Sequence, residues 1–162
     1  MDLRTAKVLV TGGGSGIGLA TARLLIHEGA QVAICGRDRE RMNKTAEEIG
    51  ATTIVADVSL ELDAARMVAT IIETFGDYNV LVNNAAVRHY SLLLDQKTDD
   101  FERVLANNVI GAMMFARESV RHFVKQNTGN IINIASTAGS RGFAGGSAYT
   151  ASKFALTALT EC

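Results

Sequence analysis

The sequence predicts an α/β fold in which a doubly wound parallel sheet is covered by helices on both faces. Short apolar runs rich in β-branched residues alternate along the chain with longer segments of helical periodicity. Strands that are apolar on both faces and separated by helices are typical of such a sheet. Right-handed crossovers and a glycine-rich turn after the first strand favour five strands in the order 3-2-1-4-5.

Each expected strand is a short apolar run that ends beside a polar or glycine-rich segment. Runs of this kind fit strands that are buried between two layers of helices. We therefore expect strands at Lys7–Thr11, Gln31–Cys35, Thr53–Ala56, Val80–Asn83 and Asn130–Ala135.

The segments between these strands show helical periodicity. The segment after the first strand places Ile17, Ala20 and Leu24 on one face, and the segment after the fourth repeats apolar residues near the same spacing. The stretch Ser136–Ser147, rich in Gly, Ser and Ala, is expected to be a loop. We expect helices at Gly16–Glu28, Arg39–Ile49, Leu62–Phe75, Asp99–Lys125 and from Ala148 onward.

The composition is that of one soluble globular domain spanning residues 1–162, with 48% hydrophobic and 20% charged residues. The net charge of −1 shows no basic excess, which argues against a nucleic-acid partner. No segment has the length of a membrane span or the pattern of a secretory signal, and two cysteines are too few for a disulfide framework. We therefore expect a cytoplasmic protein without a metal site.

The pattern is incomplete at its C-terminal end. Leu156 and Leu159 belong to a helical pattern without a stop signal before Cys162, and the sixth strand of the usual order is absent. We therefore expect the C-terminal strands of this sheet to be missing from the chain.

A glycine-rich run, TGGGSGIG at residues 11–18, connects the first strand to the first helix. Glycines allow a tight turn and a close approach to a pyrophosphate, and the N–H groups that begin the helix face the anion. An ordinary strand-to-helix turn is the alternative. The position of the run between a strand and a helix favours a Rossmann-like dinucleotide site.

This run has the spacing GxxxGxG, and in that it resembles the cofactor loop of the short-chain dehydrogenase/reductase family. The resemblance extends over Lys7–Cys162, because NNAA, NVIG and YTASK resemble further motifs of the family in the same order. It implies that Gly12, Gly16 and Gly18 form the loop and that Thr11 braces the first strand.

Gly36 follows the expected second strand, at the position where an NAD-preferring site would carry an acidic residue. Arg37 follows, and its guanidinium can pair with a 2′-phosphate through charge-assisted hydrogen bonds. These residues favour NADP(H), with NAD(H) as the alternative. Arg37 could instead belong to a solvated basic group with Arg39 and Arg41, and Asp38 could neutralise it or bind a ribose itself.

Two more strand ends resemble cofactor contacts of the family. Asp57, before Val58, matches an acid that hydrogen-bonds the adenine, although a turn or a helix cap is the alternative. Asn84 and Ala85 belong to the run NNAA, which resembles a turn that walls the cofactor. Ala86 replaces the usual glycine, which costs stability only if the backbone there needs a positive φ.

Tyr149 and Lys153 are four residues apart and therefore share one helix face. A tyrosine hydroxyl is a poor base at neutral pH, but a neighbouring ammonium favours its phenolate form and suits it to acid/base catalysis. For YxxxK alone, an exposed helix pair is the alternative. Ser136 precedes Tyr149 and can hydrogen-bond a substrate oxygen. The resemblance implies that Asn108, rather than Asn107, holds a water in a proton relay to Lys153.

The resemblance implies an oxidoreductase that moves a hydride between NADP(H) and a ketone or secondary alcohol, such as an oxoacyl compound, a sugar or a steroid. It also implies a homo-oligomer. A truncated, non-catalytic dinucleotide-binding module is the alternative. Arg88, His89 and Tyr90 either line a substrate cleft or form a surface loop. The expected cofactor contacts are Thr11, Gly12, Gly14, Ser15, Gly16, Ile17, Gly18, Arg37, Asp57, Val58, Asn84, Ala85, Tyr149 and Lys153.

Overall fold

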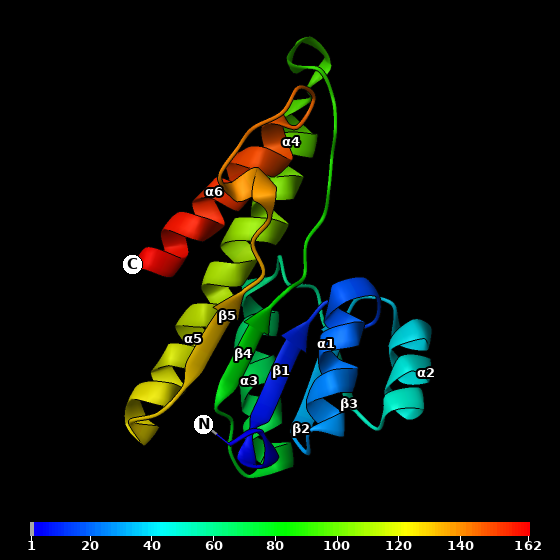
Figure 1. Ribbon diagram of the computed structural model, residues 1–162, viewed down its shortest axis with the longest axis vertical. Helices are drawn as coiled ribbons and strands as arrows, with labels where there is room; N and C mark the ends of the chain where they lie inside the picture. Colours follow the sequence, from blue (N-terminus) through cyan, green and yellow to red (C-terminus); the bar gives the residue numbers. More distant parts are fainter. Residues whose placement is uncertain (1) are drawn as a thin grey trace.

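The computed structural model describes residues 2–162, which form a parallel sheet with helices on both faces (Figure 1). The strands pair in the order β3-β2-β1-β4-β5, and every pair is parallel. The predicted fold class and strand order are therefore confirmed. The strands are β1 Lys7–Thr11, β2 Gln31–Gly36, β3 Thr52–Val55, β4 Val80–Asn83 and β5 Asn130–Asn133.

Two helix layers enclose two separate parts of the core. Side chains of α1 and α2 pack on one face of the sheet against residues such as Val8, Val10 and Ile34. Side chains of α3 and α5 pack on the other face against residues such as Leu9 and Leu81. The helices are α1 Gly16–His27, α2 Arg39–Ile49, α3 Glu61–Phe75, α4 Thr98–Leu105, α5 Ala112–Gln126 and α6 Ser147–Glu161.

The prediction of a single helix over Asp99–Lys125 was wrong in one respect. A π-helical segment, Ala106–Gly111, separates α4 from α5. The wider turn buries the polar side chains of Asn107 and Asn108. Gly111 packs closely there, since an added Cβ would lie 2.6 Å from the carbonyl oxygen of Val58. Apolar spacing alone does not reveal one wider turn inside a helix.

The ends of three predicted strands also need correction. The second strand ends at Gly36 rather than Cys35. The third strand lies one residue earlier than predicted, and the fifth ends at Asn133 rather than Ala135. The backbone N–H of Ile134 still donates to the carbonyl of Asn83, at 2.9 Å. β5 is not apolar on both faces, because Ile132 is 48% exposed. This strand lies at the edge of the described sheet, where one face is less covered.

The segments that follow β4 and β5 extend beyond the carboxyl ends of the strands, where α4 and α6 pack against each other (Figure 1). The expected loop 136–147 contains a 3-10 turn, Thr137–Gly139. It meets the segment after β4 where the N–H of Ser91 donates to Gly145, at 2.9 Å. Chain segments far apart in sequence thus converge beside the carboxyl edge of the sheet. Within residues 2–162 no helix is both long and apolar enough to cross a membrane.

Candidate functional site

A cavity of about 600 Å³ lies at the carboxyl ends of the strands, within the size range of cofactor and ligand sites. The ends of β1, β2, β3, β4 and β5 and the first half of α6 all contribute to its lining. Most of the predicted site residues meet there: Gly12, Gly14, Ser15, Gly16, Ile17, Arg37, Asp57, Val58, Asn84, Ala85, Tyr149 and Lys153. The other predicted residues, Thr11, Gly18, Asn108 and Ser136, are not part of the cavity lining.

The glycine-rich loop packs too closely for side chains at two positions. Gly12 has a φ of +66°, and an added Cβ would lie 2.9 Å from the Cα of Ala85. An added Cβ on Gly18 would lie 2.5 Å from the carbonyl oxygen of Gly12. At the start of α1, the Ser15 side chain makes no capping hydrogen bond. The first N–H groups of this helix therefore remain available to an anion in the cavity.

Thr11 holds the ends of β1 and β4 together from beneath the loop. Its hydroxyl accepts from the N–H groups of Asn84 and Ala85, both at 3.0 Å. The Asn84 side chain donates to the carbonyl oxygens of Thr11 and Gly12, at 2.9 and 3.2 Å. Ala86 has no strained backbone, because Asn127 is the one non-glycine residue with a positive φ among residues 2–162. The replacement of the family's glycine by Ala86 therefore carries no φ penalty.

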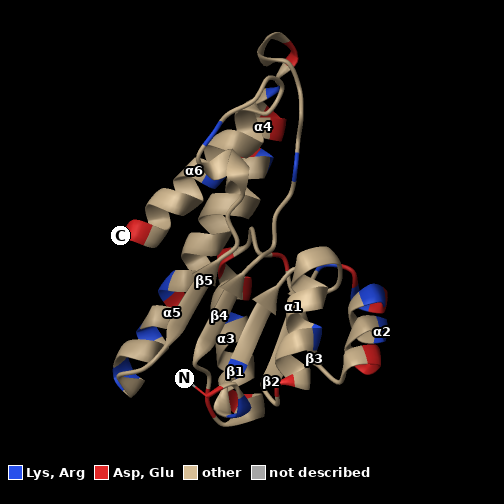
Figure 2. Cartoon of the chain, viewed as in Figure 1, with Lys and Arg blue, Asp and Glu red and all other residues tan. Residues whose placement is uncertain are grey.

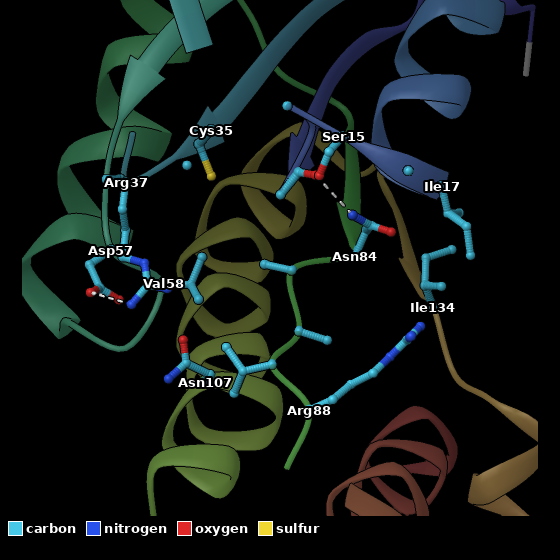
Figure 3. Close-up of a pocket in the computed structure, with 18 of the residues that line it drawn as sticks. Ser15, Ile17, Cys35, Arg37, Asp57, Val58, Asn84, Arg88, Asn107 and Ile134 are labelled. Carbon is cyan, nitrogen blue, oxygen red and sulfur yellow. Dashed lines mark hydrogen bonds and ion pairs between the residues drawn. The ribbon is translucent and has the colours of Figure 1, made fainter. Parts of the chain in front are cut away.

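Opposite charges meet at the end of the cavity formed by β2 and β3. The Nη1 of Arg37 lies 3.8 Å from Oδ2 of Asp57 (Figure 3). The other carboxylate oxygen of Asp57 accepts from the N–H and hydroxyl of Ser59, at 3.0 and 2.7 Å. Asp38 instead caps α2 by accepting from the N–H of Arg41, at 3.0 Å. Arg37 remains 65% exposed, which leaves its guanidinium accessible to a ligand.

Arg41 belongs to the same end of the cavity, although the sequence analysis considered it only as a solvated residue. It lies in the first turns of α2, beside Gly36 and Met42, and lines the cavity with them. Figure 2 colours basic residues blue on the part of α2 nearest this edge of the sheet. The sequence feature that could have indicated Arg41 is the alternation of Arg37, Arg39 and Arg41. Arg39 itself is not part of the cavity lining.

A half-buried carboxylate at the start of α3, that of Asp63, supports the backbone of Asp57. Oδ2 of Asp63 accepts from the Asp57 N–H at 2.8 Å, and Oδ1 accepts from Arg66 at 2.7 Å. Burial raises the pKa of Asp63, but the hydrogen bonds from Arg66 and Asp57 outweigh it, so that the pKa lies below its usual value. The ionised carboxylate thus fixes one wall of the cavity.

Tyr149 and Lys153 lie one turn apart on α6, and both are buried, with 8% and 3% exposure. The Lys153 Nζ lies 5.9 Å from the centroid of the Tyr149 ring and donates to the carbonyl of Ile134, at 2.6 Å. Burial lowers the pKa of Lys153, and the positive charge of Arg88 lowers it further. The hydroxyl-bearing ring and the amine therefore share the wall of the cavity.

Ser136 and Asn108 occupy supporting positions in this structure. The Ser136 hydroxyl accepts from the N–H of Ala138, at 3.1 Å, and retains its own hydrogen for another acceptor. The Asn108 side chain accepts from the N–H of Val87 at 2.8 Å and donates to its carbonyl and to Ser152. Asn108 thus holds the backbone after β4, and its expected role in a proton relay stays a prediction.

The segment after β4 contributes residues whose role the sequence left open. Arg88 lines the cavity, and its Cζ lies 5.9 Å from the Tyr149 ring centroid. Arg88 points toward Ile134 at one end of the cavity, whereas Arg37 lies at the other end (Figure 3). The Tyr90 ring packs edge-on against Tyr149, with centroids 6.0 Å apart. Their position directly after a strand is the sequence feature that could have placed these residues at the cavity.

The arrangement combines a loop suited to a pyrophosphate with a tyrosine and a lysine suited to proton transfer. No metal-binding group of three or more His, Cys, Asp or Glu side chains occurs among residues 2–162.

Comparison with known proteins shows a clear relationship. The family model for short chain dehydrogenases matches residues 6–162. An uncharacterized oxidoreductase of Bacillus subtilis is 35% identical over 98% of this chain, and a sorbitol dehydrogenase of Cereibacter sphaeroides is 37% identical over 99% of it. The crystal structure of an NAD⁺-bound xylitol dehydrogenase is 38% identical, superposes on 95% of this chain and has a TM-score of 0.89.

These relatives are longer than this chain. It spans 46% of the Bacillus protein, 63% of the Cereibacter protein and 62% of the xylitol dehydrogenase chain. The similarity therefore covers nearly all of this chain but only part of each relative.

Proposed function

Because the chain belongs to the short-chain dehydrogenase family, we propose that it moves a hydride between the nicotinamide of NADP(H) and a ketone or secondary alcohol. The observation that carries this proposal is the position of Tyr149 and Lys153. Both are buried and line the same cavity as Gly12, Gly16 and Ile17 of the glycine-rich loop. The dinucleotide, when bound, supplies the hydride donor or acceptor.

Side chains of this chain would bind the substrate oxygen and transfer the proton that accompanies the hydride. The Tyr149 hydroxyl gives a proton to the substrate oxygen or takes it back, depending on direction. The Lys153 ammonium favours the phenolate form of a tyrosine by its positive charge. The Ser136 hydroxyl donates to the substrate oxygen and stabilises charge that develops on it. Asn108 holds the segment around Val87 in place through the hydrogen bonds described above.

Arg37 and Arg41 support NADP(H) as the preferred cofactor. Both line the cavity beside Gly36, at the position where a side chain could reach a ribose 2′-phosphate. Asp57 is the one acidic residue in the lining, and it already pairs with Arg37 and Ser59. The xylitol dehydrogenase neighbour binds NAD⁺, so NAD(H) is the second candidate.

The names of the relatives favour a polyhydroxylated substrate. One relative is named a sorbitol dehydrogenase and another a xylitol dehydrogenase, and both share more than a third of their aligned residues with this chain. We also propose a homo-oligomer. Exposed apolar side chains, Ile110, Val120 and Val124, occur along α5 and the π-helical segment before it, where a second copy could cover them.

Turnover with a defined tyrosine variant tests the proposed function. NADPH oxidation is followed with a panel of ketones, and NADP⁺ reduction with the matching alcohols. We expect Tyr149→Phe to lose activity by a factor of about 100 or more, because the proton donor is removed. The control is Tyr78→Phe, since Tyr78 is buried in the core and bonds Ser119 away from the cavity. Unchanged turnover in Tyr149→Phe would show that the assignment is wrong.

A non-catalytic dinucleotide-binding module is the second candidate, because the glycine-rich loop by itself suits a dinucleotide. Both candidates predict binding of the dinucleotide to the glycine-rich loop. Binding of NADPH without turnover on any member of the panel would favour the module.

A further inference from the structure

Arg88 is a cation in the cavity wall that lies over the Tyr149 ring but has no acidic partner among residues 2–162. No hydrogen bond or ion pair of its side chain occurs among residues 2–162, although ten other basic or histidine side chains form ion pairs there. The next residue, His89, lies 3.7 Å from Asp100, and that carboxylate also accepts from Arg103. Asp100 therefore already has two basic partners, and Arg88 forms no ion pair among residues 2–162.

The surroundings of Arg88 are positive and lack acidic groups. The cavity lining contains four basic side chains, Arg37, Arg41, Arg88 and Lys153, and one acidic side chain, Asp57. Asp57 lies at the opposite end, beside Arg37 (Figure 3). The Arg88 Cζ and the Lys153 Nζ each lie 5.9 Å from the centroid of the Tyr149 ring. Burial lowers the pKa of Lys153, and the positive charge of Arg88 lowers it further. An anion at this end would meet two positive charges and no carboxylate.

Two further aromatic side chains lie beside Tyr149, outside the cavity lining itself. The Tyr90 ring lies edge-on to both Tyr149 and Phe143, with centroids 6.0 and 5.7 Å apart. Tyr90 is 55% and Phe143 49% exposed, so both rings present apolar surface toward the solvent. The backbone bond between Ser91 and Gly145 ties their two loops together. A small molecule held by the Arg88 guanidinium would therefore lie next to the Tyr149 ring, with Tyr90 packed against the same ring.

We propose that Arg88 binds the carboxylate of the substrate, and that the chain acts on a small hydroxy acid or the corresponding oxo acid. This inference rests on the proposed function and names its substrate class. The two N–H groups of a guanidinium fork can donate to both oxygens of a carboxylate, and the positive charge of the guanidinium neutralises the negative charge of the carboxylate. Its Cζ lies 5.9 Å from the Tyr149 ring, so the bound anion and the reacting hydroxyl would belong to one small molecule.

Pairs of compounds that differ only in the carboxylate test the inference. D-gluconate is compared with D-sorbitol, and 3-hydroxybutyrate with its methyl ester. We expect the acids to have a kcat/KM about 10- to 100-fold higher than their neutral partners in the unmodified chain. In Arg88→Met this ratio should fall to about 1, and Arg88→Lys should restore part of it. Arg23→Met is the matched control, because Arg23 is exposed on α1 and outside the cavity lining.

Binding measured in parallel separates the inference from the proposed function. Saturation-transfer NMR reports binding of the same acids and neutral partners whether or not turnover occurs. Acid binding that is lost in Arg88→Met, without turnover in any variant, would support the inference and contradict the proposed function.

Three outcomes would overturn the inference. The first is no preference for the acids in either measurement. The second is an equal loss of kcat for acids and neutral partners in Arg88→Met, which would mean that Arg88 acts on the reaction itself. The third is a matching loss of NADPH affinity, which would make Arg88 a cofactor contact.

Discussion

The two exposed arginines at opposite ends of the cavity differ in whether they have an acidic partner. Arg37 lies 3.8 Å from Asp57, and Arg88 has no ion pair among the described residues. The Asp57 carboxylate divides its interactions between Arg37 and Ser59, and the Arg37 side chain is 65% exposed. An ion pair of this length and exposure is worth little, so a phosphate can compete for the guanidinium at small cost.

This comparison leads to a prediction about cofactor choice. We expect Arg37→Met to lower kcat/KM for NADPH by a factor of about 10 to 100, because a charge-assisted hydrogen bond to the 2′-phosphate is lost. The value for NADH should change by less than a factor of about 3, since NADH has no phosphate at that position. Steady-state kinetics with both cofactors measure the two effects.

Arg39→Met is the control for this prediction. Arg39 starts α2 and is exposed, but it is not part of the cavity lining. It should leave the preference between the two cofactors unchanged. An equal loss with NADPH and NADH in Arg37→Met would contradict a role in phosphate recognition.

Residues in short motifs with fixed spacing could be predicted from the sequence, and residues brought in by long connections could not. Gly12, Gly16, Tyr149 and Lys153 were all expected at the cavity, where the structure brings them together. Phe143 was not, because its packing against Tyr90 depends on how two distant loops meet beyond the sheet.

At the scale of elements, the positions of the helices and strands were predictable and their junctions were not. Apolar periodicity reports which face of a segment is buried, and it found every strand of the described sheet. It does not report the π-helical turn at Ala106–Gly111, which depends on close packing of Gly111 against Val58. That packing brings the π-helical segment between α4 and α5 against the loop that carries Asp57. The junction therefore connects the helix layer to the cavity wall.

The junction between β3 and α3 leads to a prediction about pH. Asp63 has a depressed pKa in the folded chain, so it stabilises the fold at pH values above its unfolded value of 3.8. This contribution is lost as the pH falls through the folded-state pKa. We expect Asp63→Ala to lower the free energy of unfolding by about 2 kcal/mol at pH 7, through loss of the bonds to Asp57 and Arg66.

Urea unfolding at a series of pH values measures this effect. The difference between Asp63→Ala and the unmodified chain should stay constant from about pH 7 to pH 5 and shrink below about pH 4. Asp99→Ala is the control, because Asp99 lies in the first turn of α4 and forms no ion pair among residues 2–162. A difference that stays the same at every pH would mean that the charge of Asp63 contributes nothing.

At the scale of the whole molecule, the strand order determines where a ligand can bind. The chain leaves β1 toward β2 on one side, and β4 pairs with β1 on the other. The connections after β1 and β4 therefore diverge and leave a crevice at the carboxyl ends of these two strands. Gly12 and Asn84 lie at this crevice, and their hydrogen bond joins its two sides. The cavity is thus a consequence of topology, and the side chains that line it decide its chemistry.

Because the topology forms the cavity and the side chains decide its chemistry, cofactor binding and catalysis can be measured separately. Ligands that bind only the folded state stabilise it, by about 2.7 kcal/mol at a concentration of 100 times Kd. For a chain of this length we expect the melting temperature to rise by roughly 5 to 10 °C with saturating NADPH. Tyr149→Phe should keep most of this rise, because the glycine-rich loop is intact and only a hydroxyl is lost. Differential scanning fluorimetry measures both shifts, and a melting temperature that neither NADPH nor NADH raises would contradict dinucleotide binding by this fold.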